Sequence, residues 1–355
     1  MTNVRATNRD FEKYHQVRKD HSYRLAENET DAFDEDYEIA ALDFSAFLSG
    51  DAEDKARFAG AFASALREIG FAVLTGHGVD SGLYDDIHDG VLDLFSTTPM
   101  DEKMRFRAAR SGSVAQGYFP LEETSDIHPD LVEGWVWCRR AFDIPQDRGR
   151  PFRAEEFWPS PDYERLFRRL VLAHEPLFKP IIQAMFQGLG VDPHLYDQKL
   201  TRTNFGLRLN HYPPMSLAQD RSGAGRLFGH EDVDLFTILP ASRIDGLQVW
   251  NHRSGKWVRM RAPYGSIIIN TGDYMQRITN DALPSTTHRV GKPSDRSHLT
   301  VPRVSFPIAV YVWEDVVLEV LPGLGEPRYP PIKAIAFHTR STSKFYGDDY
   351  AVDED

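Results

Sequence analysis

The chain has 355 residues, 41% of them hydrophobic, which is enough to bury a substantial core in one large domain or two intimately packed ones. A formal net charge of -12 and the lack of any basic run argue against binding to bare nucleic acid or to an anionic membrane. The single cysteine, Cys138, leaves no partner for an internal disulfide, and no apolar stretch approaches a membrane span or the core of a secretory signal. We therefore expect a soluble, cytoplasmic protein.

The N-terminal part of the chain changes character twice. Residues 1–37 are dense in charge and poor in aliphatic side chains, so we expect an arm that is flexible or folds over the surface. Apolar residues then recur at helical spacing over 51–70 and stop at Gly70. The elements predicted before residue 200 are a helix over 51–70, a buried strand within 71–79, a helix over 80–96 and a long helical segment over 160–190, bent or restarted near Pro180.

From Leu200 onward the segments are short, apolar or alternating, and separated by Gly, Pro, Asn and Asp. Turn residues recur about every 8–14 positions, as in a β-sandwich or barrel. The fold class that we predict is α+β, with a jelly-roll (double-stranded β-helix) core and a helical N-terminal half packed around it. The predicted regions are a charged arm (1–37), a helical region (38–199), the jelly-roll core (200–315) and a C-terminal segment that could form a lid (316–355).

The stretch "GHEDVDLFTIL" places His230 and Asp232 directly before an alternating, strand-like segment. Side chains at i and i+2 of a strand share one face, so an imidazole and a carboxylate here can converge on a metal ion. His288, in "STTHRVG", is a third candidate ligand beside another short strand. The same His-x-Asp pattern occurs at His128 and Asp130, but no comparable strand context accompanies it.

A second pair of polar residues, Arg303 and Ser305, occupies positions i and i+2 of an apolar strand. A buried arginine needs an anionic partner, and no acidic residue is its neighbour in sequence. Two imidazoles and one carboxylate on one face of a metal leave the opposite face open, which is the facial triad of non-haem Fe(II) oxygenases. The sequence thus indicates a metal site and, beside it, a place for a carboxylate ligand.

These residues fall within a set of motifs that resembles the isopenicillin N synthase-like family of Fe(II)/2-oxoglutarate-dependent oxygenases. The resemblance covers roughly residues 38–315, and it is specific as an ordered set, whereas each piece alone is weak. The matching segments are "REIGFAVLTGHGV" (67–79), "RLNHYPP" (208–214), "GHED" (229–232), "GLQVW" (246–250), Trp257, "IIINTGDYMQRITND" (267–281), "STTHRV" (285–290) and "RVS" (303–305).

The resemblance implies a role for each of these residues. His230, Asp232 and His288 would bind Fe(II), while Arg303 and Ser305 would hold the distal carboxylate of 2-oxoglutarate. Arg296 is a rival for the arginine role, because the interval between the third ligand and Arg303 is longer than the family pattern suggests. Further contacts to the co-substrate would come from two residues of "NHYPP", namely Asn210 and Tyr212.

The activity that follows is oxidation of a small organic molecule with Fe(II), 2-oxoglutarate and O₂, with hydroxylation as the default and desaturation or cyclisation as variants. Two alternatives stay open: an oxidase without 2-oxoglutarate, whose substrate carboxylate would bind Arg303, and an inactive jelly-roll binding module. Aromatic segments at 117–119 and 133–137, and the tail 338–350, could roof the site. For the aromatic segments core packing is the simpler interpretation, and for Glu133 a surface salt bridge. The sequence does not specify the substrate or the oligomeric state.

Overall fold

The structure is a computed structural model that describes residues 13–19, 27, 30–121, 130–142, 157–201, 203–216 and 225–352. The elements before residue 200 are β1 (Ala41–Asp43), α2 (Ser45–Ser49), α3 (Ala52–Ile69), β2 (Phe71–Thr75), α4 (Ser81–Thr97), α5 (Met100–Met104), β3 (Ala109–Ser111), β4 (Val114–Phe119), β5 (Glu133–Cys138), α6 (Arg139–Phe142), α7 (Pro161–His174), η3 (Glu175–Leu177) and α8 (Phe178–Gly188).

The remaining elements form most of the β-structure. They are β6 (Asn204–Tyr212), β7 (Leu227–His230), β8 (Phe236–Pro240), β9 (Leu247–Asn251), β10 (Lys256–Arg259), β11 (Ile267–Thr271), α10 (Asp273–Ile278), β12 (His288–Val290), η4 (Arg296–Thr300), β13 (Arg303–Ser305), β14 (Ile308–Tyr311), β15 (Val317–Leu318), β16 (Ile332–Lys333), α11 (Ala334–Tyr346) and η5 (Asp348–Tyr350).

Helix α3 has the ends that its sequence predicts. The Asp51 carboxylate accepts hydrogen bonds from the backbone N–H groups of Glu53 and Asp54, which satisfies donors that the first turn leaves free. At the other end Gly70 is left-handed, with φ 73°, and its N–H donates to the Leu66 carbonyl.

The long helical segment is interrupted, as predicted. Helix α7 ends at His174, and a single 3₁₀ turn that contains Pro176 joins it to α8. Pro180 instead lies in the first turn of α8, where its missing N–H has no helical partner to lose. The predicted restart near Pro180 is confirmed, since α8 begins two residues before it, and the irregular turn itself contains Pro176.

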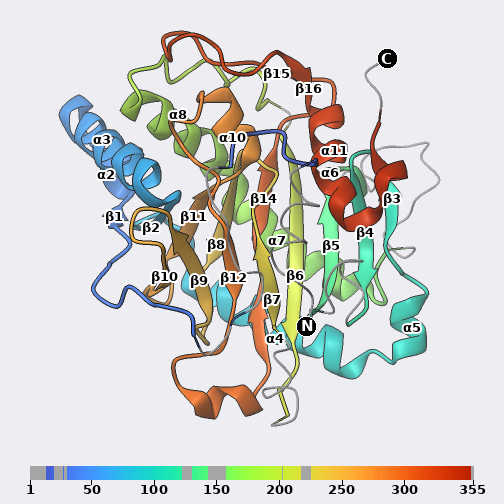
Figure 1. Ribbon diagram of the computed structural model, residues 1–355. Helices are drawn as coiled ribbons and strands as arrows, with labels where there is room; N and C mark the ends of the chain where they lie inside the picture. The colour runs from blue at the N-terminus through green and yellow to red at the C-terminus, as the bar shows by residue number, and fades with distance from the viewer. Residues whose placement is uncertain are drawn as a thin grey trace.

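Two sheets face each other (Figure 1). The large sheet has the strand order β1-β2-β11-β8-β14-β6-β5-β4-β3, with β13 also paired to β6, and the small sheet has the order β10-β9-β12-β7. The N-terminal half supplies strands at both edges of the large sheet, so the predicted helical region is also part of the β-structure. One hydrophobic core joins helices of that half to strands beyond residue 200, as expected for halves that share a core.

Strand β6 shows how the large sheet separates its two faces. Phe205, Leu207 and Leu209 are fully buried in the core shared with the helices. The alternate residues Arg208 and Asn210 point to the opposite face and line a cavity, as the two-residue period of a strand requires. The alternation predicted from the sequence therefore places Arg208, Asn210 and Tyr212 of "RLNHYPP" on one wall.

The described part of the charged arm packs on the surface. Val17 is buried in the main core, and the Lys19 ammonium lies 2.6 Å from Asp273 Oδ1, with both side chains almost fully buried. The dark-blue segment in Figure 1 runs from α10 toward α11. Its backbone carbonyls accept hydrogen bonds from Gln276 and Arg277 of α10. The arm thus folds over the protein and contributes to its core.

Among the described residues, no helix combines the length and the apolar composition needed to cross a bilayer.

Candidate metal and co-substrate site

The two candidate histidines are neighbours on adjacent strands of the small sheet. Strands β7 and β12 pair antiparallel with His230 opposite His288, and their ring centroids lie 4.4 Å apart. Asp232 does not continue the strand, because β7 ends at His230 and the next strand begins at Phe236. The predicted placement of both ligands on one strand is therefore wrong. One ligand atom from each of the three residues nevertheless lies within 4.8 Å of the others.

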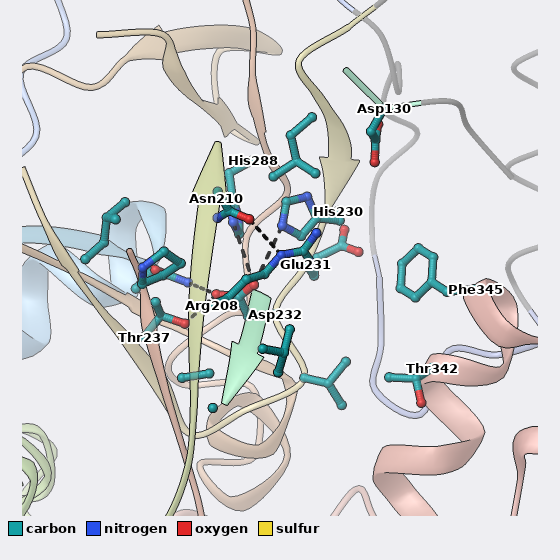
Figure 2. Close-up of a pocket in the computed structure, with 18 of the residues that line it drawn as sticks. Asp130, Arg208, Asn210, His230, Glu231, Asp232, Thr237, His288, Thr342 and Phe345 are labelled. Atoms are coloured by element: carbon teal, nitrogen blue, oxygen red, sulfur yellow. Dashed lines mark hydrogen bonds and ion pairs between the residues drawn. The ribbon is translucent and has the colours of Figure 1, made fainter. Parts of the chain in front are cut away.

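Hydrogen bonds to the backbone orient both imidazoles. His230 Nδ1 lies 2.8 Å from the Phe228 carbonyl, and His288 Nδ1 lies 3.1 Å from the Thr286 carbonyl. Each Nδ1 therefore carries the proton, which leaves each Nε2 with a lone pair. Both Nε2 atoms lie 3.8 Å from Asp232 Oδ1, and Figure 2 shows the three groups converging.

The carboxylate of Asp232 is held through its other oxygen. Oδ2 accepts hydrogen bonds from the Thr237 hydroxyl at 2.6 Å and from Asn270 Nδ2 at 2.8 Å, so Oδ1 remains available. Burial would raise the pKa of Asp232, but the neighbouring imidazoles and these hydrogen bonds outweigh it and the pKa is lowered. Burial, with a smaller effect of His288, lowers the pKa of His230 to about 4. A carboxylate and neutral imidazoles are the forms that bind a divalent metal.

A second carboxyl group supports the first. Asp234 is fully buried, and its burial together with the charge of Asp232 raises its pKa well above the usual value. Its Oδ2 lies 2.7 Å from Thr237 Oγ1. A neutral Asp234 can donate to Thr237, which leaves the Thr237 proton for Asp232. The Asp234 side chain packs directly against the backbone of Gly272. Only glycine fits there, because a Cβ at position 272 would lie 2.2 Å from Asp234 Oδ1.

Glu231 lies between the two candidate ligands in sequence. The structure buries it, with 2% of its surface exposed, and Thr287 donates a hydrogen bond to its Oε1. Glu231 also borders the cavity, and its charge acts to raise the pKa of Lys19 of the arm and of Lys344 of α11.

The four residues predicted to contact the co-substrate form two cross-strand pairs. In the register of β13 and β6, Arg303 lies opposite Tyr212 and Ser305 opposite Asn210. The Arg303 guanidinium lies 4.9 Å from the centre of the Tyr212 ring, and Asn210 Nδ2 donates to Ser305 Oγ at 3.3 Å. Arg296, the rival arginine, is exposed and does not line the cavity.

The guanidinium of Arg303 is only partly satisfied. Its Nε donates to the carbonyls of Ile244 and Asp245, and its Nη2 to Ser242 Oγ at 3.3 Å, whereas Nη1 is buried without a partner. Burial lowers the pKa of Arg303, although Tyr212 opposes this effect. An unpaired buried guanidinium nitrogen that borders a cavity is suited to a carboxylate.

A neighbouring arginine was not predicted. Arg226 is buried with 1% of its surface exposed, and its Nε and Nη1 have no hydrogen-bond partner. Burial and, to a smaller extent, the charge of Arg303 lower the pKa of Arg226 to about 10. No sequence signal separated it from the other arginines, since it precedes β7 in a segment without clear alternation.

One cavity of about 260 Å³ joins both groups of residues. Helix α11 and η5 form part of its wall, and Figure 2 shows Thr342 and Phe345 across the cavity from the triad. The residues that line it and were predicted to take part in the site are Asn210, Tyr212, His230, Asp232, His288, Arg303 and Ser305.

Other predicted elements lie elsewhere. Glu133 is not in a surface salt bridge: its carboxylate is buried, 2.8 Å from Lys103 Nζ and 2.9 Å from His211 Nδ1. The rings of the two aromatic segments are buried in the core, as we preferred, and only Val136 of those segments borders the cavity. Cys138 is buried, which raises the pKa of its thiol. Of the competing His-x-Asp pair, His128 lies outside the described residues.

Both halves of the chain match families of known proteins. Residues 39–161 match the family described as "non-haem dioxygenase in morphine synthesis N-terminal". Residues 203–309 match the 2OG-Fe(II) oxygenase superfamily. The chain is 30% identical to the 2-oxoglutarate-dependent dioxygenase citB of Monascus ruber over 71% of this chain and 79% of that one. It is 29% identical to the 2-oxoglutarate-Fe(II) type oxidoreductase hxnY of Emericella nidulans, over 82% of this chain and 85% of that one. The chain belongs to the 2-oxoglutarate/Fe(II) oxygenase family.

Solved structures agree with this assignment. A 2OG-Fe(II) oxygenase family protein from Caulobacter crescentus superposes with a TM-score of 0.70 at 29% identity, over 84% of this chain and 96% of that one. A Neurospora crassa protein crystallised with alpha-KG and thymine gives 0.74 at 22% identity, over 91% and 100%, and supports the jelly-roll fold. The protein is an oxidoreductase that uses Fe(II), 2-oxoglutarate and O₂, as the resemblance implied.

Proposed function

We propose that His230, Asp232 and His288 bind the iron of this oxygenase through the two Nε2 atoms and Asp232 Oδ1. The observation that carries the proposal is the convergence of these three atoms, each left free by hydrogen bonds at the other atom of its group. Two neutral imidazoles and one carboxylate suit Fe(II), and three protein ligands leave coordination positions for other molecules.

Arg303 and Ser305 then hold the distal carboxylate of 2-oxoglutarate, with Tyr212 beside them and Asn210 fixing the Ser305 hydroxyl. The unpaired Arg303 Nη1 supports this role, because it supplies a charge-assisted donor in a buried place. Iron bound at the triad supplies the redox chemistry that couples the decarboxylation of 2-oxoglutarate to oxidation of the substrate, with succinate and CO₂ as products.

The substrate in this proposal is a small organic molecule, oxidised by hydroxylation unless its placement favours desaturation or ring closure. The protein contributes a shielded cavity whose walls are mostly apolar outside the two polar groups. The C-terminal segment 316–355 acts as a lid in this proposal, since α11 borders the cavity. The role in the chemistry of small metabolites is inferred only by analogy with the relatives named above.

The test is an anaerobic titration of the metal-free protein with Fe(II) and then 2-oxoglutarate, followed by the visible charge-transfer absorption of an iron–2-oxo acid chelate. The wild type should give a saturable band, Asp232→Ala should lose it with the iron, and Arg303→Leu should require far more 2-oxoglutarate. Iron binding without any band would instead favour an oxidase whose substrate carboxylate occupies Arg303. Failure to bind iron would overturn the assignment of the triad.

A further inference from the structure

A second arginine faces the same cavity and has no assigned role. Arg208 lies on β6, on the same face as Asn210 and Tyr212, and borders the cavity. Its Nε donates to Asn210 Oδ1 at 2.8 Å, while its Nη2 is buried without a hydrogen-bond partner. Among the residues that the structure describes, no carboxylate forms an ion pair with it. Its charge is therefore uncompensated in the protein alone.

The position of Arg208 separates it from the co-substrate arginine. Arg208 lies four residues from Tyr212, and four residues of a strand span about 13 Å. Tyr212 is the residue paired with Arg303, so the backbones of the two arginines reach the cavity at different points along β6. Arg208 borders the same cavity as His230, Asp232 and His288. Figure 2 shows it beside the triad.

The surroundings of Arg208 are apolar. Val136 of β5 lies directly opposite it in the sheet, and the Phe119 ring lies 5.9 Å from its guanidinium carbon. Val114 and Ala115 of β4 continue this wall, and Phe345 of α11 also borders the cavity. A ligand here would place a hydrocarbon body among these side chains and an anionic group on the guanidinium.

We propose that Arg208 binds the carboxylate of the substrate, and that the substrates of this enzyme are carboxylic acids with an apolar body. The proposal rests on the function proposed above, since it places the acid next to the iron site. A planar guanidinium with a free Nη2 recognises a carboxylate by a charge-assisted hydrogen bond, which a neutral amide of the same shape cannot replace. Arg208 is in these terms a specificity residue.

The test compares each acid with its own amide. Phenylacetate, 3-phenylpropionate and 2-naphthoate, and their primary amides, are dialysed at pH 7.5 without O₂ against the protein loaded with Fe(II) and 2-oxoglutarate. We expect the wild type to bind at least one acid about tenfold or more tightly than its amide, and Arg208→Met to reduce that preference to about twofold or less. Arg208→Lys keeps the positive charge but loses the planar guanidinium, so it should retain part of the preference for the acid.

Arg105→Met is the matched control, because it removes one positive charge from an exposed residue outside the cavity and should leave the preference unchanged. The proposal is overturned if no acid binds better than its amide, or if the preference survives in Arg208→Met. It is also overturned if Arg208→Met weakens the 2-oxoglutarate band, because Arg208 would then serve the co-substrate. If the wild type forms no band, the proposed function fails, and dialysis against the protein without iron still decides whether Arg208 selects acids.

Discussion

The two walls of the cavity differ in how their charged groups are paired. In the histidine wall (His230, Asp232 and His288), the two Nδ1 atoms and Asp232 Oδ2 are hydrogen-bonded. The two Nε2 atoms and Asp232 Oδ1 converge and are left free. The arginine wall (Arg208, Asn210, Tyr212, Arg303 and Ser305) leaves one nitrogen of each guanidinium buried and unpaired. The first wall is thus prepared for a cation and the second for anions. The predictions below test that division.

The largest expected effect is on the histidine wall. His288→Ala removes one of three converging atoms and should lower Fe(II) affinity by more than about 100-fold, beyond what loss of an outer hydrogen bond causes. Equilibrium dialysis with Fe(II) under argon measures it. His298→Ala, in the polar turn of η4, is the control and should bind iron normally. Equal affinities for the two variants would contradict the assignment.

The arm gives the second prediction, on stability. Lys19→Met leaves Asp273 buried without its partner and should lower the free energy of unfolding by about 3 kcal/mol in urea titrations. Arg208→Met removes a charge that has no counterion, so its effect should be below about 1 kcal/mol. A large loss for Arg208→Met would show that its charge stabilises the fold, against the division between the walls.

The contribution of Lys19 also has a defined pH range. Burial would lower its pKa, but the charges of Asp273 and Glu231 outweigh burial and raise it above 10.5. A raised pKa in the folded state means that the stabilisation is complete below pH 10.5 and is lost as pH rises through the folded value. The difference in the free energy of unfolding between the wild type and Lys19→Met should therefore stay constant from about pH 6 to 9. It should shrink only in strong alkali.

The third prediction concerns the arginine wall. Arg303→Lys keeps a positive charge but loses the fork, and should weaken 2-oxoglutarate binding by about 10- to 100-fold, as measured by titration of the visible band. Iron affinity should stay within about twofold, because Arg303 contacts none of the three ligands. A parallel loss of iron affinity would mean that the walls are coupled.

The smallest expected effect is at the support of Asp232. Thr237→Val preserves the shape of the side chain and removes the hydrogen bond to Oδ2, so iron affinity should fall by about tenfold. Thr237→Ser restores the hydroxyl and should bind nearly as well as the wild type. If Thr237→Val binds iron like the wild type, the hydroxyl does not orient the carboxylate.

The sequence predicted those parts of the site that depend on strand alternation and short spacing. Arg303 was preferred to Arg296 because it heads an apolar strand, and the structure buries the first and exposes the second. The same alternation, continued from Tyr212 and Asn210, would have identified Arg208. Arg226 had no such signal, because its burial depends on loops that pack from distant parts of the chain.

The errors have a common physical cause. Glu133 was interpreted as a surface residue because its neighbours in sequence do not include Lys103 or His211, which reach it only in the folded chain. Asp232 was placed on a strand because alternation cannot show where backbone pairing stops. Local pattern thus predicts which face a residue occupies, and tertiary contacts decide whether it is buried and paired.

The contact between the N-terminal arm and η5 has a consequence for the order of folding during synthesis. Tyr14 donates a 2.7 Å hydrogen bond to Asp348, a residue 334 positions later. The triad and its strands leave the ribosome before α11 does, so the cavity of the nascent jelly roll stays open on the α11 side for as long as translation of the remaining residues takes. The iron site is therefore complete before α11 adds its part of the cavity wall.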